Sequence, residues 1–152
     1  MKKFFVAAAM LGMAATAQAQ VLNGTFNSGR DEETENSSSM DIRFGACEYD
    51  SSLTCAWAVR SVAADGSTNE GVMLEPSDNF DPNDGQPFEM AGALLLTGLS
   101  PDGEGRWAGG LFYNPATGRE FDGVYARLTD SGDIDVGGCI LIFCQDTTFT
   151  KL

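Results

Sequence analysis

The sequence predicts an all-β protein, a small antiparallel barrel or sandwich of about eight strands held by two local disulfides. Three observations predict it. Short segments alternate apolar and polar residues. Turn signals separate them at spacings of roughly 8–12 residues. Four cysteines follow an N-terminal export signal. Eight antiparallel strands in one small domain can close into a barrel, because closure removes exposed sheet edges.

The first nineteen residues have the pattern of a signal peptide. Lys2 and Lys3 supply the positive start, residues 4–15 form a short apolar stretch, and Ala17-Gln18-Ala19 supplies the small residues for cleavage. The apolar stretch is too short to span a bilayer, and no later stretch is long and apolar enough to do so. We therefore expect a single mature domain over residues 20–152, in the periplasm or secreted.

The cysteines are Cys47, Cys55, Cys139 and Cys144. An even number in an exported protein indicates two disulfides, and four cysteines allow three pairings. We favour Cys47–Cys55 and Cys139–Cys144, because each pair is close in sequence. A four-cysteine zinc site is the alternative. The spacing of the first pair is wider than structural zinc sites favour, and the chain has no histidine.

The chain divides into short strands separated by polar loops. Two polar, acidic segments, residues 28–39 and 75–87, read as loops. Residues 91–96 fit a buried strand or a short helix. The expected strands are 21–26, 40–46, 53–62, 71–74, 91–96, 106–113, 120–128, 134–142 and 147–151.

Aromatic residues fall on the expected inward faces of several strands, namely Trp57, Trp107, Tyr113, Phe121 and Tyr125. They indicate either a packed core or a lined cavity. Gly109 and Gly123 lie between aromatics on the same faces and leave room in the lumen. Eight-stranded barrels have the size at which filling by side chains and holding one small ligand are both feasible.

Composition argues against several functions. The formal charge is −13, or −15 without Lys2 and Lys3, so the surface repels phosphate backbones and we expect no nucleic-acid partner. Without histidine, triads built on Ser-His or Cys-His are excluded. Five residues of the 75–87 loop offer oxygen ligands for calcium: Asp78, Asn79, Asp81, Asn83 and Asp84. Their spacing fails the EF-hand pattern, which favours a solvated turn.

Residues 106–118, RWAGGLFYNPATG, resemble a bacterial family of small exported proteins, domain of unknown function 2147. The residues that carry the resemblance are Trp107, Gly109, Gly110, Tyr113, Asn114, Pro115 and Gly118. Three further segments are similar to the family: residues 78–82, the pair Cys47 and Cys55, and the Gly138-Cys139 stretch with Cys144. The resemblance covers residues 40–152. The chain departs from the family pattern at Ala56, Phe149 and Lys151. The resemblance implies a lipocalin-like barrel that can hold an apolar ligand.

We therefore expect a binding module for a small apolar or amphipathic ligand. The ligand would stack on Trp107, Tyr113 and Trp57. The first alternative is an envelope structural or interaction protein with a filled barrel. The second is a hydrolase that uses paired carboxylates. No recognisable catalytic constellation supports an enzyme, and the sequence implies neither a cofactor nor a metal.

Overall fold

The computed structural model describes residues 20–30, 33, 37–76, 81, 83–114 and 118–152. The expected signal peptide, residues 1–19, lies outside this part. The described residues form strands and turns, with no helix among them. The strands are β1 (Gly24–Asn27), β2 (Ser39–Ala46), β3 (Thr54–Val62), β4 (Thr68–Asn69), β5 (Met73–Leu74), β6 (Phe88–Glu89), β7 (Leu94–Pro101), β8 (Arg106–Asn114), β9 (Arg119–Leu128), β10 (Ile134–Ile140) and β11 (Phe143–Lys151).

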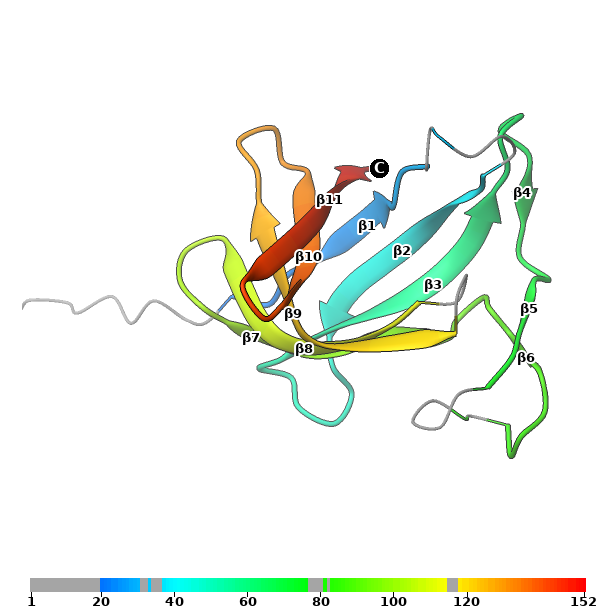
Figure 1. The fold of residues 1–152 in the computed structure, drawn as a ribbon, viewed down its shortest axis with the longest axis horizontal. Helices are drawn as coiled ribbons and strands as arrows, with labels where there is room; N and C mark the ends of the chain where they lie inside the picture. Colours follow the sequence, from blue (N-terminus) through cyan, green and yellow to red (C-terminus); the bar gives the residue numbers. More distant parts are fainter. Residues whose placement is uncertain (1–19, 31–32, 34–36, 77–80, 82, 115–117) are drawn as a thin grey trace, which may run out of the picture.

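Eight of these strands close into one antiparallel barrel. Their hydrogen-bonded order is β2-β1-β11-β10-β9-β8-β7-β3, and β3 pairs back onto β2 to complete the ring. Figure 1 shows the ring, with the short strands β4, β5 and β6 beside it. Strand β4 pairs with β3, while β5 and β6 pair with each other. The predicted eight-stranded barrel is confirmed, and the sandwich is not formed.

Both predicted disulfides are confirmed. Cys47–Cys55 ties the β2–β3 connection to β3, with 4.9 Å between the Cα atoms. Cys139–Cys144 joins opposite residues of β10 and β11, with 3.9 Å between the Cα atoms. Because every cysteine is in a disulfide, the four-cysteine zinc site is excluded.

Most expected strand limits are close to those observed. Strands β2, β3, β8 and β9 match the expected ranges to within one residue. The strand expected at 91–96 lies instead at Leu94–Pro101. Of residues 71–74, only Met73 and Leu74 form a strand. The strand expected at 134–142 ends at Ile140, and the one expected at 147–151 starts earlier, at Phe143, because the chain turns at Leu141–Ile142.

Two glycines interrupt the alternation of β8 and β9. Trp107 pairs with Ala126 and Gly110 pairs with Val124, so β8 contains one extra residue there. Phe112 pairs with Phe121, so β9 contains one extra residue in the next interval. Gly109 (φ 80°) and Gly123 (φ 64°) occupy these intervals with positive φ, the conformation of glycine in a G1 bulge. Each bulge exchanges the inward and outward faces of the residues beyond it.

The bulges overturn part of the predicted inward face. Gly109 is exposed on β8, and Gly110 takes the inward place instead. On β9 the buried residues beyond the bulge are Val124 and Ala126, whereas Tyr125 faces outward. The prediction that Gly109, Gly123 and Tyr125 face the lumen is therefore wrong.

Trp57 also faces outward, contrary to the prediction. It pairs with the exposed Arg43, whose guanidinium lies 4.4 Å from the ring centroid. Its neighbours Ala56 and Ala58 are each 1% exposed and face the core. Arg43 and the Cys47–Cys55 disulfide cover the outer side of β3. This side can therefore carry apolar residues, which made it resemble an inward face in the sequence.

One end of the barrel is filled by side chains. Leu99 and Ile134 are fully buried there, together with Trp107 at the start of β8. The Trp107 indole Nε1–H donates a hydrogen bond of 2.7 Å to the Gln20 carbonyl oxygen, which ties the chain entering the barrel across this end. The packing is tight at Gly110, where a Cβ would lie 3.0 Å from side-chain atoms of Leu99. This end is therefore closed, and any space lies at the other.

Candidate ligand-binding cavity

A cavity of about 1030 Å³ occupies the end of the barrel opposite Trp107. The segments that form it are the ends of β8 and β10 and the beginnings of β2, β9 and β11. The ribbon of β5 and β6 adds part of the wall through Val72, Leu74 and Met90. The apolar side chains of the lining are Met40, Ile42, Val72, Leu74, Met90, Phe112, Phe121, Val124, Val136, Ile140, Phe143 and Phe149.

The buried part of the lining is apolar, and its exposed part is mixed. Ile42, Met90 and Val124 are at most 3% exposed and form the floor. Nine polar side chains also line the cavity, and four of them are exposed: Ser38, Asp122, Gln145 and Thr147. The exposed Ile140 and Phe143 lie in the same lining. An apolar floor beneath a mouth that offers both polar and apolar groups suits a ligand with one apolar and one polar end.

The charges in the lining are negative. Glu120 and Asp122 belong to it, and the lining within the described residues includes neither lysine nor arginine. The described lining therefore supplies no lysine or arginine to pair with a carboxylate or phosphate headgroup. Because like charges repel, it favours a neutral or positively charged headgroup over an anionic one.

The structure brings one of the expected ligand-binding residues to the cavity. Phe121 lines it and is 36% exposed. Trp107 and Tyr113 are buried at 5% and 3% exposed, yet neither is in the lining. The Tyr113 hydroxyl donates to the Glu75 carbonyl oxygen at 2.7 Å, which holds the residue that follows β5 against the end of β8. Burial, with the nearby charges of Glu120 and Glu75, raises the pKa of Tyr113.

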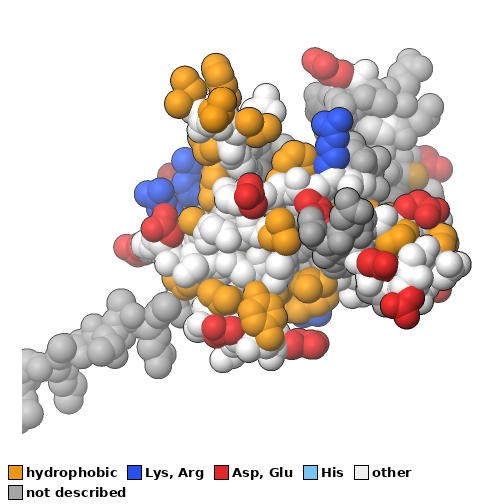
Figure 2. All heavy atoms as spheres, turned by 60° about the horizontal axis from the view of Figure 1, so that its bottom comes forward, with side chains coloured by type: hydrophobic (Ala, Val, Ile, Leu, Met, Phe, Trp, Pro, Cys, Tyr) orange, Lys and Arg blue, Asp and Glu red, His pale blue; other side chains and the backbone are white. Residues whose placement is uncertain are grey.

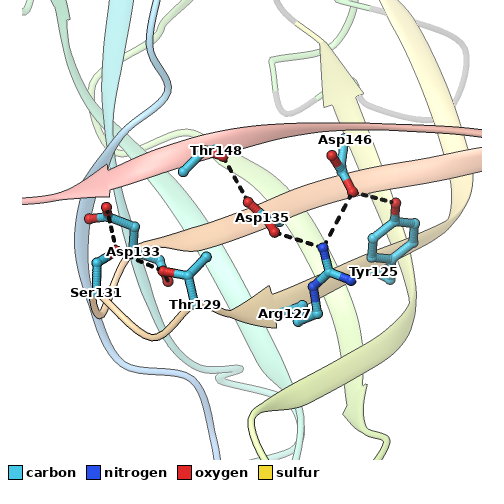
Figure 3. A network of polar contacts seen from close by, with 8 residues as sticks. All are labelled: Tyr125, Arg127, Thr129, Ser131, Asp133, Asp135, Asp146 and Thr148. Atoms are coloured by element: carbon cyan, nitrogen blue, oxygen red, sulfur yellow. Dashed lines mark hydrogen bonds and ion pairs between the residues drawn. The ribbon is translucent and has the colours of Figure 1, made fainter.

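The other expected residues lie outside the barrel. Trp57 is stacked under Arg43, and Gly109 forms its bulge. Figure 3 shows Tyr125 in a polar network on the outer face of β9, β10 and β11, where its hydroxyl donates to Asp146 at 3.1 Å. These three positions have no place in a ligand site inside the barrel.

The network in Figure 3 consists of charged and polar side chains on the surface of the barrel. Arg127 on β9 donates to Asp135 on β10 at 2.8 Å and lies 3.8 Å from Asp146 on β11. The hydrogen bond from Arg127, followed by the one from Thr148, lowers the pKa of Asp135. The network links three strands on the side that faces away from the cavity.

Sequence reasoning missed most of the lining. Met40 and Ile42 had a signal, since they alternate in a strand that was expected to be half-buried. Gly138 had none, although it lines the cavity and a Cβ built on it meets nothing within 4 Å. Among its described residues, the acidic loop at 75–87 contributes none to the lining. Its Asp81 carboxylate accepts the backbone N–H of Gly85 at 2.8 Å, as in a solvated turn, while Asp78 and Asn79 lie outside the described residues.

A closed eight-stranded antiparallel barrel with one filled end and one open apolar end is a lipocalin-like barrel. The chain belongs to the bacterial family described as an uncharacterized protein conserved in bacteria, domain of unknown function 2147, whose model matches residues 29–151.

A solved structure supports the fold. Protein HP1028 from the human pathogen Helicobacter pylori, described as a member of the lipocalin family, superposes with a TM-score of 0.63. The two chains are 18% identical, and the similarity covers 86% of this chain and 82% of that one. Among curated proteins, no significant match to the chain was found. The predicted resemblance to the family and to the lipocalin fold is confirmed.

Within the described residues, no helix has the length and apolar character needed to cross a membrane. The two disulfides are of the kind that form in oxidising compartments.

Proposed function

We propose that this protein is an exported, non-catalytic binding module that holds a small apolar or amphipathic molecule inside its barrel. The observation that carries the proposal is the cavity of about 1030 Å³, with its floor of buried apolar side chains. Ligand sites typically enclose roughly 300–1,000 Å³ and are predominantly apolar, with a few polar groups. The cavity supports a binding module in preference to the filled-barrel alternative.

The lining also defines the kind of ligand. Apolar area removed from water at the floor supplies the affinity, at roughly 25 cal/mol per Å². The serine, amide and threonine groups at the mouth supply hydrogen-bond partners for a polar end. Glu120 and Asp122 lead us to expect that neutral or cationic amphiphiles bind more tightly than fatty-acid carboxylates of equal chain length.

The test uses a neutral probe and a variant that fills the cavity. N-phenyl-1-naphthylamine fluoresces in apolar surroundings and carries no charge. Gly138→Trp places a large side chain in the lumen, at a position with free space and without a left-handed backbone. The matched control is Gly71→Trp, because Gly71 is exposed, is outside the lining and also lacks a left-handed backbone.

We expect the wild type and Gly71→Trp to bind the probe with similar affinity and Gly138→Trp to bind it about tenfold more weakly, which corresponds to about 1.4 kcal/mol. Equal binding by all three proteins would contradict a site inside the barrel. If the probe binds as expected, native mass spectrometry of protein purified from its own host would identify a co-purifying molecule.

Export is part of the same proposal. The disulfides support a periplasmic or secreted location, since such bonds persist outside the reducing cytoplasm. Cell fractionation followed by sequencing of the mature N-terminus tests it. The expected terminus is Gln20, and an intact Met1 on the folded protein would contradict processing.

A further inference from the structure

The hairpin between β10 and β11 ends in four exposed apolar residues, which we call the hairpin tip: Ile140, Leu141, Ile142 and Phe143. Their side chains are 70%, 92%, 87% and 74% exposed. In Figure 2, hydrophobic side chains stand out from the body of the molecule where this hairpin ends. The four residues are consecutive, so they form one patch and not scattered surface positions.

The residue at the turn is not the one that turn geometry favours. Leu141 has φ 56°, a conformation that glycine and asparagine adopt more easily. A large apolar side chain here is unfavourable both for the backbone and for exposure to water. Neither cost has a compensation within the fold, because Leu141 is almost fully exposed.

The hairpin tip is held in place before any contact is made. Strands β10 and β11 pair continuously from Ile134 and Phe149 to Ile140 and Phe143. The Cys139–Cys144 disulfide closes the hairpin directly behind the tip. The four side chains are therefore presented on a rigid support, so little conformational entropy is lost when they are buried.

The electrostatics of the hairpin tip differ from those of the rest of the chain. Residues 136–145 contain no charged side chain, although the whole chain has a formal charge of −13. The hairpin tip is thus the part of this acidic protein that is cheapest to transfer out of water. The acidic remainder would be repelled from an anionic surface.

We propose that the hairpin tip inserts into the boundary between headgroups and acyl chains of a lipid bilayer. The hairpin tip protrudes and carries no charge, so it can enter the apolar part of a fluid bilayer without burying a charged group. A protein partner of standard interface size would need about 800 Å² of complementary surface. The cavity also argues for lipid, because Ile140 and Phe143 belong both to the hairpin tip and to the cavity lining. Insertion therefore places the cavity mouth at the membrane surface, where apolar and amphipathic molecules are found.

The inference goes beyond the proposed function, since insertion does not require an occupied cavity. The test is co-sedimentation of the full-length mature protein with phosphatidylcholine–phosphatidylethanolamine vesicles. The tip variant is Leu141→Asn combined with Ile142→Ser, because asparagine accepts the positive φ of position 141. The matched control is Leu152→Asn, which removes a leucine that is 64% exposed outside the hairpin.

We expect the wild type, Leu152→Asn and Gly138→Trp to bind these vesicles alike, and the tip variant to bind at least tenfold more weakly. Adding phosphatidylglycerol should weaken wild-type binding, and added salt should restore it, since salt screens the repulsion. Stronger binding to anionic vesicles would overturn the proposal, as would equal binding by the tip variant. Failure of the wild type to bind vesicles would also overturn the proposal. If sedimentation velocity then showed a wild-type dimer and a monomeric tip variant, the hairpin tip would be a contact between two copies of the chain.

Discussion

Replacing Gly137 by alanine should destabilise the barrel, whereas the same replacement at Gly138 should not. A Cβ at Gly137 would lie 2.7 Å from the Asp146 Cβ, 2.8 Å from its Cα, and closer still to the Gln145 carbonyl oxygen. Real Cβ atoms do not approach other atoms so closely. Two of these three atoms belong to the backbone of β11, so no side-chain rotation relieves the clash, and the strands must separate.

The expected size follows from the atoms involved. Inserting a methyl group into a packed site costs about 1–3 kcal/mol. Because the obstacle here is largely backbone, we expect the upper part of that range, about 3 kcal/mol. In a domain of this length, 1 kcal/mol corresponds to roughly 4 °C in the thermal midpoint, so the midpoint should fall by about 12 °C. A Cβ at Gly138 meets nothing within 4 Å, and Gly138→Ala should change stability by less than about 1 kcal/mol.

Urea unfolding followed by far-ultraviolet circular dichroism measures both variants in one experiment. The account predicts a large loss for Gly137→Ala and almost none for Gly138→Ala. A large loss for Gly138→Ala with almost none for Gly137→Ala would refute the register of β10 against β11, because a shift of one residue exchanges the crowded and the open glycine. Equal midpoints for the two variants would contradict the close contact at Gly137.

Three further predictions concern the Cys139–Cys144 disulfide, the ion pair of the buried Asp41 with Arg60, and pH. Cys139→Ser should leave Cys144 reactive toward a thiol probe and lower stability by about 2 kcal/mol; labelling of unreduced wild type would contradict the disulfides. Arg60→Met removes the 2.7 Å partner of the Asp41 carboxylate, whose side chain is 4% exposed, and should cost about 1–3 kcal/mol in urea unfolding; an unchanged midpoint would argue against the ion pair. The pKa of Asp135 is lowered in the folded state, so its contribution is present above its unfolded pKa of about 3.9 and is lost as pH falls through the folded value. Asp135→Asn should therefore make the urea midpoint less dependent on pH below about pH 4, and an unaltered pH profile would contradict this contribution.

The strands and disulfides were predictable because their causes are local. Alternation over residues 40–46 reflects a sheet with one buried face, and the structure has a strand there. Cysteines close in sequence paired as expected because short connections bring them together. These features require no knowledge of which strands are neighbours in the barrel.

The faces of the strands were less predictable because bulges depend on neighbours. Gly109 and Gly123 were read as gaps in the lumen, whereas each forms a bulge that exchanges the two faces. Trp57 looked like an inward aromatic, yet Arg43 from the adjacent strand covers it on the outside. A sequence pattern alone does not reveal a partner that arrives from another strand.

The sequence analysis missed the hairpin tip and most of the cavity lining for a related reason. Leu141 and Ile142 form a turn without glycine, proline or asparagine, so the apolar run looked like one continuous strand. The cavity depends on where strands end relative to one another, which brings Met90 and Phe149 together from distant parts of the chain. Only the closed ring defines that arrangement.

The most direct test of the central claim is a methyl NMR titration with N-phenyl-1-naphthylamine. The account predicts shifts at cavity methyl groups such as those of Ile42, Met90 and Val136, with Leu99 and Ala126 at the filled end unaffected. Shifts confined to the filled end or to the outer faces of the strands would show that the open end of this barrel is not where an apolar molecule binds.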